Sequence, residues 1–468
     1  MAEEHDLIIL GSGSTAFAAA LRATSHGARV LMIEKSALGG TCVNWGCIPS
    51  KTLIHAAQIY QDARLGTRIG VGLRDEGVDF AALSDNKERV VGHLRQTRYM
   101  DILHNVPGLT LVRGTGRFLD SRTIEVEDQQ FRGEKFLIAT GGYPRIPVIP
   151  GLTGSDFLTS RSALLLRELP RSLVIIGGGV IALELGQMYR RLGASVTVLE
   201  HGPRVLPPVD AEVALAVQES LRSEGIDIVL DVKVCGVTRN NGMTLVQCAQ
   251  GGVTVKFSAE RLLVAVGTAP ATAGIGLDKA GVKLDGKGFV RVDDMMRTSV
   301  PGIWAAGDVV GGMMIATAGA REGVVAVDDM FNPGCGCTID HLSIPMAIFT
   351  DPEVGLVGHT EVSAREAGYE VVSNTLPISA IPKAHVTGQT AGVIKLVADV
   401  ATGRILGVHL ACHRGADIVN EAALAVRFRL TVADLANSLH VYPSMGEGLR
   451  LCAQGFDRDV SKLSCCAE

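Results

Sequence analysis

The chain has 468 residues, of which 47% are hydrophobic, 20% are charged, only 4% are aromatic and 55 are glycine. This length exceeds one ordinary hydrophobic core, and the composition is typical of a globular α/β protein with several domains, not of a disordered or fibrous chain. The net charge of -5 leaves no broad basic surface, so the sequence predicts no nucleic-acid partner.

The N-terminal segment predicts neither export nor membrane insertion. Residues 1–6 are acidic and lead directly into an apolar segment, without the basic start and long apolar run of a signal peptide. The sequence also lacks a run of about 18 apolar residues, which a membrane helix needs. We expect a soluble, cytoplasmic protein whose ten cysteines are catalytic, metal-binding or inert rather than structural disulfides.

The first expected unit, within residues 7–34, is a strand, a glycine-rich turn, a helix and a second strand. In this pattern Gly11 allows a tight turn, Gly13 lets the backbone approach a pyrophosphate, and the small Ala16 lets the helix pack closely. The second strand ends at Glu34, whose carboxylate is placed to accept ribose hydroxyls.

Two cysteines, Cys42 and Cys47, follow this unit. At helical spacing near a helix start they can form a local disulfide, and the helix dipole favours the thiolate. Such a dithiol accepts two electrons. Zinc binding is the competing interpretation, although no second Cys/His pair stands nearby at the usual spacing. Inert buried cysteines are the third.

The dinucleotide pattern recurs further along the chain. Gly177, Gly179 and Ala182 repeat the turn, and the second strand ends at Glu200, so that in both copies the glutamate follows the first glycine by 23 positions. One such motif also fits a tight turn of an unrelated α/β unit. Two copies in register predict two dinucleotide-binding folds.

Further apolar strands end in turns of small residues. The turn at Thr140 and Gly141 and the turn at Gly267 are each expected to close one nucleotide fold. A later strand is followed by Asp308, whose carboxylate suits a sugar hydroxyl or a phosphate-linked chain. The alternative is that Asp308 caps the next helix.

The chain ends in a vicinal pair, Cys465 and Cys466, on a tail that we expect to be mobile. Adjacent thiols favour a soft metal ion and can pass it to another thiol pair. An inert pair is the alternative. Cys335 and Cys337 lie in a loop that could carry metal, but a solvent-exposed turn is the preferred interpretation. The remaining four cysteines are expected to be inert: Cys235, Cys248, Cys412 and Cys452.

Residues 39–51 read Gly-Gly-Thr-Cys, four further residues, then Cys-Ile-Pro-Ser-Lys, and they resemble the flavoprotein disulfide reductases. The resemblance covers nearly the whole chain. It implies an α/β fold with two Rossmann-like domains, for FAD and for NAD(P)H, and an α+β C-terminal dimerisation domain. We expect a first FAD segment at 1–145, the NAD(P) domain at 146–268, a second FAD segment at 269–331 and the C-terminal domain at 332–468.

The same resemblance implies roles for single residues. Cys47 faces the flavin and Cys42 exchanges with the substrate. Thr41 and Lys51 belong to the FAD site, with Lys51 near the flavin N5 and paired with Glu184.

The C-terminal region departs from the common disulfide reductases. Those proteins have a histidine general base in a His-Pro-Thr-x-x-Glu stretch, whereas here Tyr442 stands at that position and Glu447 is retained. A phenol with a pKa near 10 cannot cycle protons at neutral pH as imidazole does. His440, two residues earlier, is a weak substitute and is more simply a surface histidine.

Tyr442 and the ending with Cys465 and Cys466 together resemble the mercuric reductases. This resemblance implies a homodimer in which Cys465 and Cys466 of the partner subunit take Hg(II) from a thiol complex and pass it to Cys42 and Cys47, while Tyr442 positions or shields the metal. Two alternatives remain: a disulfide reductase like dihydrolipoamide dehydrogenase, and a non-catalytic protein that sequesters metal.

Two further features differ from the pattern of the mercuric reductases: the start of the chain and the residue that faces the coenzyme ribose. Many mercuric reductases carry an N-terminal metal-binding domain, whereas this sequence starts at the FAD fold, so we expect a catalytic core. Glu200 repels a 2'-phosphate and slightly favours NADH, although His201 or Arg204 could meet a phosphate and the family resemblance implies NADPH.

Overall fold

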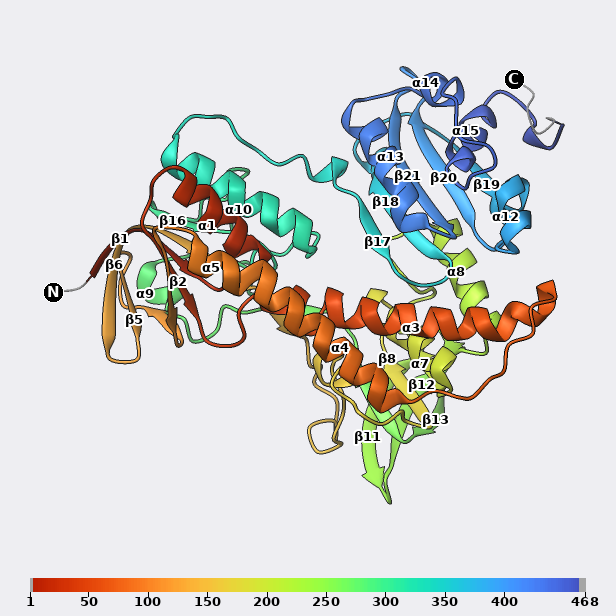
Figure 1. The fold of residues 1–468 in the computed structure, drawn as a ribbon, viewed down its shortest axis with the longest axis horizontal. Helices are drawn as coiled ribbons and strands as arrows, with labels where there is room; N and C mark the ends of the chain where they lie inside the picture. The colour runs from red at the N-terminus through yellow and green to blue at the C-terminus, as the bar shows by residue number, and fades with distance from the viewer. Residues whose placement is uncertain (1–2, 463–468) are drawn as a thin grey trace.

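The computed structural model describes residues 3–462. Figure 1 shows three bodies, with the first part of the chain at the left, the middle part below and the C-terminal part at the upper right. The first body contains a seven-stranded sheet in the order β3-β2-β1-β6-β5-β4, with β16 paired to the carboxyl half of β6 on the side where β5 pairs with its amino half. Its strands are β1 (Glu3–Leu10), β2 (Val30–Glu34), β3 (Leu109–Arg113), β4 (Gly116–Phe118), β5 (Thr123–Val126), β6 (Gln129–Ile138) and β16 (Ile303–Ala305).

Two separate chain segments build this first body. The alanine-rich helix α1 (Ser14–Ser25) packs against α10 (Ala316–Phe331), and the packing is close because Gly319 and Gly323 of α10 face Thr15. A side-chain carbon at Gly319 would lie 2.5 Å from the Thr15 hydroxyl. The remaining helices of this body are α2 (Gly40–Trp45), α3 (Cys47–Leu65), α4 (Phe80–Arg95), α5 (Asp101–Asn105) and α9 (Leu277–Ala280).

The second body repeats the parallel arrangement. Its sheet has the order β10-β9-β8-β14, and an antiparallel sheet β11-β12-β13 lies beside it. The bounds are β8 (Ser172–Ile176), β9 (Ser195–Leu199), β10 (Asp227–Val229), β11 (Lys233–Asn240), β12 (Met243–Gln250), β13 (Val253–Ala259), β14 (Arg261–Val264), α6 (Ser160–Ala163), α7 (Val180–Leu192) and α8 (Ala211–Ser223). The short ribbon of β7 (Gly142–Pro144) and β15 (Thr268–Pro270) connects the first two bodies. The domain boundaries expected from the sequence stay a prediction.

The third body is an antiparallel sheet in the order β17-β18-β21-β20-β19. Every residue of β21 is buried, because α13 packs on this strand and α8 of the second body also reaches it. The bounds are β17 (Met346–Ile348), β18 (Glu353–Gly358), β19 (Val371–Pro377), β20 (Val393–Asp399), β21 (Ile405–Cys412), α11 (Glu361–Glu366), α12 (Pro382–Thr387), α13 (Gly415–Arg427), α14 (Val432–Ala436) and α15 (Glu447–Gln454).

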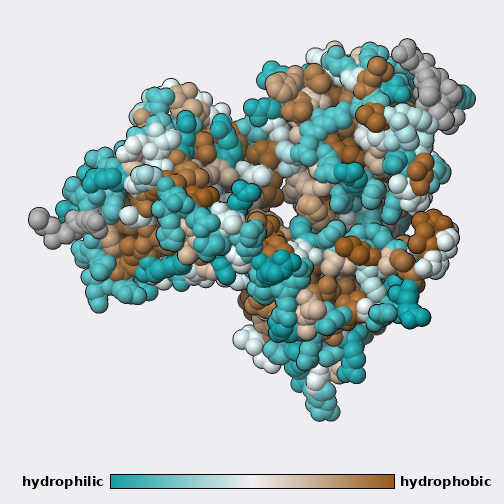
Figure 2. Space-filling view, in the orientation of Figure 1, coloured by the Kyte–Doolittle hydropathy of each residue, from teal (hydrophilic) through white to brown (hydrophobic). Residues whose placement is uncertain are grey.

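This architecture confirms the predicted α/β class with two doubly wound folds and an α+β C-terminal part. Among residues 3–462, no helix has both the length and the apolar character needed to cross a bilayer. In the space-filling view, apolar patches interrupt a largely hydrophilic surface on all three bodies (Figure 2).

Candidate redox active site

The two cysteines of the predicted dithiol lie on consecutive helices. Cys42 is inside α2, and Cys47 is the first residue of α3. The two helices are separate because Gly46 leaves helical geometry at φ -126° and ψ -109° and ends α2. The interruption places Cys47 at a new helix N-terminus, where the dipole stabilises a thiolate.

The pKa values of the two thiols are shifted in opposite directions. The pKa of Cys47 is lowered to about 7, first by a hydrogen bond with the Cys42 thiol and then by the Lys51 cation, while burial opposes both. The pKa of Cys42 is raised, because its proton is held toward Cys47 and because it is buried. Both cysteines are free in this structure. Of the two thiols, Cys47 therefore loses its proton first and becomes the nucleophilic thiolate, while Cys42 keeps its proton.

Lys51 and Glu184 meet as the resemblance implied. Lys51 Nζ lies 2.6 Å from Glu184 Oε2 and 4.7 Å from the centre of the Phe349 ring. The second oxygen of Glu184 accepts the backbone N–H of Phe349 at 2.8 Å. This buried carboxylate therefore joins α3, α7 and the segment before β18, which come from all three bodies.

The same face of α7 continues this polar contact. Gln187 exchanges two hydrogen bonds with the backbone of Asp351, at 2.8 and 2.9 Å. One turn further, Arg191 pairs with Glu224 at 2.6 Å and with Asp351 at 2.7 Å. Residues 184, 187 and 191 lie on one side of a helix, so the three bodies are held in register around Lys51.

The first glycine-rich turn lies against the dithiol helix. Gly11 has φ +113°, and a side-chain carbon there would lie 2.3 Å from the Ala139 carbonyl oxygen. A side-chain carbon at Gly40 would lie 2.5 Å from the Gly13 Cα. Only glycines permit this approach, which places α2 beside the N-terminus of α1.

The two glutamates at the strand ends are held in equivalent ways. Glu34 accepts the Ser12 hydroxyl and the Ser36 N–H, each at 2.6 Å. Glu200 accepts the backbone N–H of Gly178 and, at 2.7 Å, that of Gly202. In both copies the carboxylate accepts one hydrogen bond from the residue after the first glycine of the turn. It accepts a second from the residue two positions after the glutamate.

The second turn borders open space. Gly177 lies against the Ala265 carbonyl as Gly11 lies against that of Ala139, and Ala182 in the first turn of α7 is fully buried. Side-chain carbons at Gly141, Gly179 and Gly267 would meet no neighbour within 4 Å. Both turns precede helix N-termini, so these residues fit the pyrophosphate groups of FAD and of a nicotinamide coenzyme.

Asp308 and Thr140 lie at the carboxyl edge of the first sheet. Asp308 is half-buried, and burial raises the pKa of its carboxyl. Its neighbour Gly307 contacts Thr15 at the start of α1, and Gly307 N–H is bound at 2.7 Å by the buried Glu322. Thr140 donates to the Ala271 carbonyl at 2.8 Å. Glu322 was missed in the sequence, where nothing distinguishes it from other helical glutamates.

Arg161 and Phe349 were also missed. Arg161 of α6 stacks over Trp45, between the two cysteines, at 5.0 Å, and it donates to the Gly142 carbonyl at 3.1 Å. Its Nη2 also lies 3.5 Å from the hydroxyl of Thr41, a predicted FAD-site residue. The contacts of Arg161 with Trp45 and Thr41 join segments more than 100 residues apart, so no local pattern predicts them.

Among the described residues, the C-terminal candidates Tyr442, His440 and Glu447 lie in the third body, beside its sheet and α15. Tyr442 is 47% exposed, and α15 packs on α14, β19 and β20 (Figure 1). His440 is bound to Glu421, Nε2 to Oε1, at 2.8 Å, and this contact raises the pKa of His440. Glu447 is buried, with Arg450 at 3.4 Å. His440 is thus engaged by a different carboxylate from the retained Glu447.

The other cysteines differ in exposure. Burial raises the pKa of Cys248 to about 11 and those of Cys412 and Cys452 to about 12, which agrees with inert thiols. Cys235 is exposed. Cys335 and Cys337 are half-buried, but residues 332–334, 336 and 338 around them are exposed, which agrees with the expected solvent-exposed turn. The tail pair, Cys465 and Cys466, lies outside the described residues.

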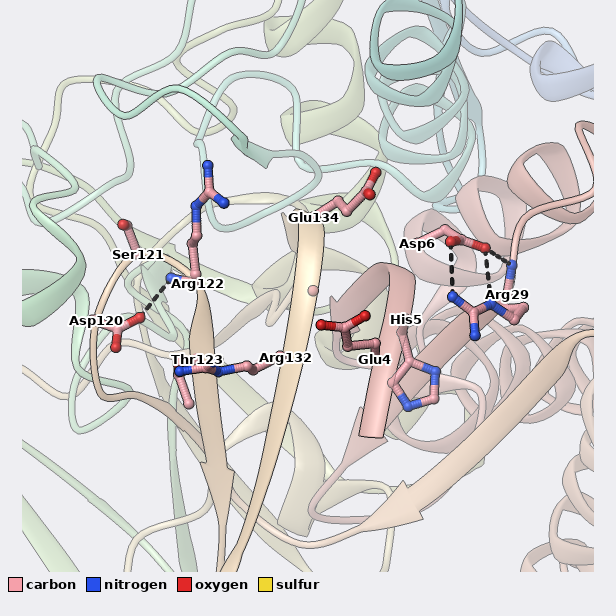
Figure 3. Close-up of a pocket in the computed structure, with 11 residues that line it drawn as sticks. Glu4, His5, Asp6, Arg29, Asp120, Ser121, Arg122, Thr123, Arg132 and Glu134 are labelled. Carbon is pink, nitrogen blue, oxygen red and sulfur yellow. Dashed lines mark hydrogen bonds and ion pairs between the residues drawn. The ribbon is translucent and has the colours of Figure 1, made fainter. Parts of the chain in front are cut away.

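A polar hollow of about 490 Å³ occurs at the opposite edge of the first sheet. Figure 3 shows Asp6 bound to Arg29 and Asp120 bound to the Arg122 backbone there. Glu4 and Arg132 stand opposite each other in the register of β1 and β6, near the amino ends of these strands. Because dinucleotides bind at the carboxyl ends of parallel strands, this hollow is separate from the redox site.

Comparisons with known proteins agree with this geometry. The family described as pyridine nucleotide-disulphide oxidoreductase matches residues 5–323, and its dimerisation domain matches residues 344–453. A mercuric reductase of Staphylococcus aureus is 40% identical over 99% of this chain and 84% of its own length. A dihydrolipoyl dehydrogenase of Thermus scotoductus is 37% identical over 97% of this chain and 98% of its own. The structure of the HOCl-induced flavoprotein disulfide reductase RclA from Escherichia coli, solved as a Cu(II) complex, superposes with a TM-score of 0.87 at 31% identity, covering 97% of this chain and 99% of that one.

Proposed function

This chain belongs to the pyridine nucleotide-disulphide oxidoreductase family, and on that premise we propose that it reduces Hg(II) to elemental mercury with NAD(P)H as the electron source. The observation that carries the proposal is a dithiol with a pKa of about 7 at Cys47, combined with a C-terminal segment whose histidine, His440, is bound to Glu421. FAD, when bound, supplies two-electron exchange between the nicotinamide and the dithiol.

The dithiol is suited to hold a soft metal ion. Cys47 offers a thiolate near neutral pH, and Cys42 becomes a second thiolate when its proton leaves. Hg(II) bound by both sulfurs accepts two electrons, the two Hg–S bonds open, and the two thiolates remain. Lys51 offsets the negative charge of this site, and Glu184 holds Lys51 in place.

This reaction needs ligand exchange rather than a histidine base. A disulfide substrate requires protons to be delivered to the leaving thiolates, which a phenol at position 442 does poorly at neutral pH. We propose that Tyr442 instead positions or shields the metal. Sequence identity does not separate the two activities, since the mercuric reductase and dihydrolipoyl dehydrogenase relatives are nearly equally similar.

We propose that the active site is completed by a second subunit. The dimerisation domain is present, and Leu439 and Val441 beside Tyr442 are 84% and 79% exposed, which suits a surface covered by another copy. Cys465 and Cys466 of the partner subunit would take Hg(II) from a thiol complex and transfer it to Cys42 and Cys47.

For the coenzyme we propose a slight preference for NADH. The proposal is supported by Glu200, a carboxylate at the end of the second strand that would repel a 2'-phosphate, and by Arg204, which donates to the backbone carbonyls of Leu206 and Pro207 at 2.9 and 2.8 Å. A cation held in this way is less available to offset the repulsion between carboxylate and phosphate.

One assay separates the candidates. Under anaerobic conditions, oxidation of NADH and NADPH is followed with Hg(II) in excess small thiol, with glutathione disulfide and with lipoamide. We expect turnover with Hg(II) alone. Turnover with a disulfide and not with Hg(II) would establish the dihydrolipoamide dehydrogenase-like alternative, and loss of coenzyme oxidation with every acceptor would indicate metal sequestration.

A further inference from the structure

A second pair of thiols lies on the segment between α10 and the C-terminal sheet. Cys335 and Cys337 flank Gly336, in the stretch between the end of α10 at Phe331 and the 3-10 turn at His341–Ser343. Gly334 has φ +86° and Gly336 has φ +65°, a backbone region that favours glycine. These two glycines turn the chain so that both cysteines face the same point.

The contacts between the two cysteines are direct. The backbone N–H of Cys337 donates to Cys335 Sγ at 3.2 Å, and the nearby Cys335 side chain raises the pKa of Cys337. An N–H donor stabilises a thiolate at Cys335, while the proton stays on Cys337. Both thiols are free and half-buried.

The charges around the pair are mixed. Arg297 interacts electrostatically with Cys335, and this guanidinium is held by Asp329 through two hydrogen bonds. Arg321 favours the Cys337 thiolate, whereas Asp328 opposes it. The fixed cation beside Cys335 supports a pair that carries one negative charge.

We propose that Cys335 and Cys337 bind one Hg(II) ion through both sulfurs, outside the catalytic dithiol. Within residues 3–462, no three His, Cys, Asp or Glu side chains converge as a metal site, so this pair suits an ion satisfied by two thiolates. Hg(II) has this preference, and soft thiolates select soft ions. The choice of Hg(II) rests on the proposed function.

Binding is a ligand exchange without electron transfer. Hg(II) arrives bound to two small thiolates. The Cys335 and Cys337 sulfurs replace them, so that two carrier Hg–S bonds break and two protein Hg–S bonds form. The Cys337 proton leaves with one carrier ligand as a thiol, and the other carrier ligand leaves as a thiolate, which conserves the single negative charge.

The test uses the full chain with Cys42, Cys47, Cys465 and Cys466 replaced by serine. The FAD-loaded variant is mixed with mercuric chloride in excess glutathione and passed through a desalting column, and the bound mercury is measured by mass spectrometry. Glutathione outcompetes single thiols, so we expect about one Hg(II) per subunit. Cys335→Ser or Cys337→Ser in this background should remove it, while Cys235→Ser, the exposed single thiol, should retain it.

Two results would overturn the proposal: no mercury retained by the four-serine variant with its FAD still bound, or equal retention after Cys335→Ser. The Cys337→Ser variant provides a second reading if Cys335→Ser fails to fold. Failure of the proposed function would appear differently, as absence of Hg(II)-dependent coenzyme oxidation by the unchanged protein, a measurement that does not require Cys335.

Discussion

Lys51 and Glu184 form an ion pair, 2.6 Å from Nζ to Oε2, between helices that belong to the two different dinucleotide folds. The pair connects an electrostatic function to a structural one. Lys51 lowers the pKa of Cys47 one helical turn away, and Glu184 keeps Lys51 there while it also binds the Phe349 backbone.

Replacing Lys51→Met should therefore raise the pKa of Cys47. In the reduced parent, alkylation of Cys47 by iodoacetamide should increase with pH to a plateau, with a midpoint at about 7. In the variant the midpoint should move to higher pH, because the thiolate has lost a neighbouring cation. Peptide mass spectrometry identifies the alkylated cysteine. Lys35→Met, a change at an exposed lysine, is the control, and an unchanged midpoint in Lys51→Met would contradict this account.

Gly40→Ala should weaken FAD binding and destabilise the protein. Its side-chain carbon would lie 2.5 Å from Gly13 Cα and push α2 from the glycine turn. Gly27→Ala is a matched control, because Gly27 also has positive φ, at +79°, but has open space around it. Backbone strain of about 1–2 kcal/mol is expected in both, whereas loss of FAD on gel filtration is expected only for Gly40→Ala. Equal FAD retention would show that the close contact does not shape the site.

Glu200→Gln should increase the use of NADPH relative to NADH. The amide keeps an acceptor oxygen for one of the Gly178 and Gly202 N–H groups, which the carboxylate binds through separate oxygens, and it removes the charge that faces a 2'-phosphate. The ratio of kcat/KM values for the two coenzymes should shift toward NADPH by up to about tenfold, or about 1.4 kcal/mol. Parent enzyme that already prefers NADPH would show that His201, Arg204 or another cation dominates.

The double change Cys465→Ala with Cys466→Ala should leave flavin reduction by the coenzyme intact. Turnover of Hg(II) presented as a bis-thiol complex should fall sharply, because the outer thiols that displace the carrier ligands are gone. Hg(II) with weakly held halide ligands should still be reduced at Cys42 and Cys47. Stopped-flow and steady-state absorbance measure the two steps, and parent-like turnover of the thiol complex would refute a delivery role.

Delivery between subunits has a separate test. Dimers that combine the tail variant with a Cys42→Ala variant contain one site with an intact dithiol facing an intact partner tail. Some activity on thiol-bound Hg(II) should return after subunit exchange. Verified mixed dimers without activity would place delivery within one chain.

The sequence alone determined the features whose causes are local. Glycine spacing and strand polarity predicted both dinucleotide folds, because each turn, helix and terminal glutamate is contained in about two dozen consecutive residues. The motif around Cys42 and Cys47 predicted a redox centre there, and its resemblance to a known family predicted the pairing of Lys51 with Glu184 that the structure contains.

Only the tertiary structure decided how these parts are tuned. Gly46 separates the cysteines onto two helices, and the lowered pKa of Cys47 depends on the resulting contacts with Cys42 and Lys51. Phe349 and Arg161 join the site from segments that no local pattern links to it. The contact between Cys335 and Cys337 likewise depends on left-handed glycines. Proton affinities and close approaches arise from distances in the folded chain, which spacing along the sequence does not contain.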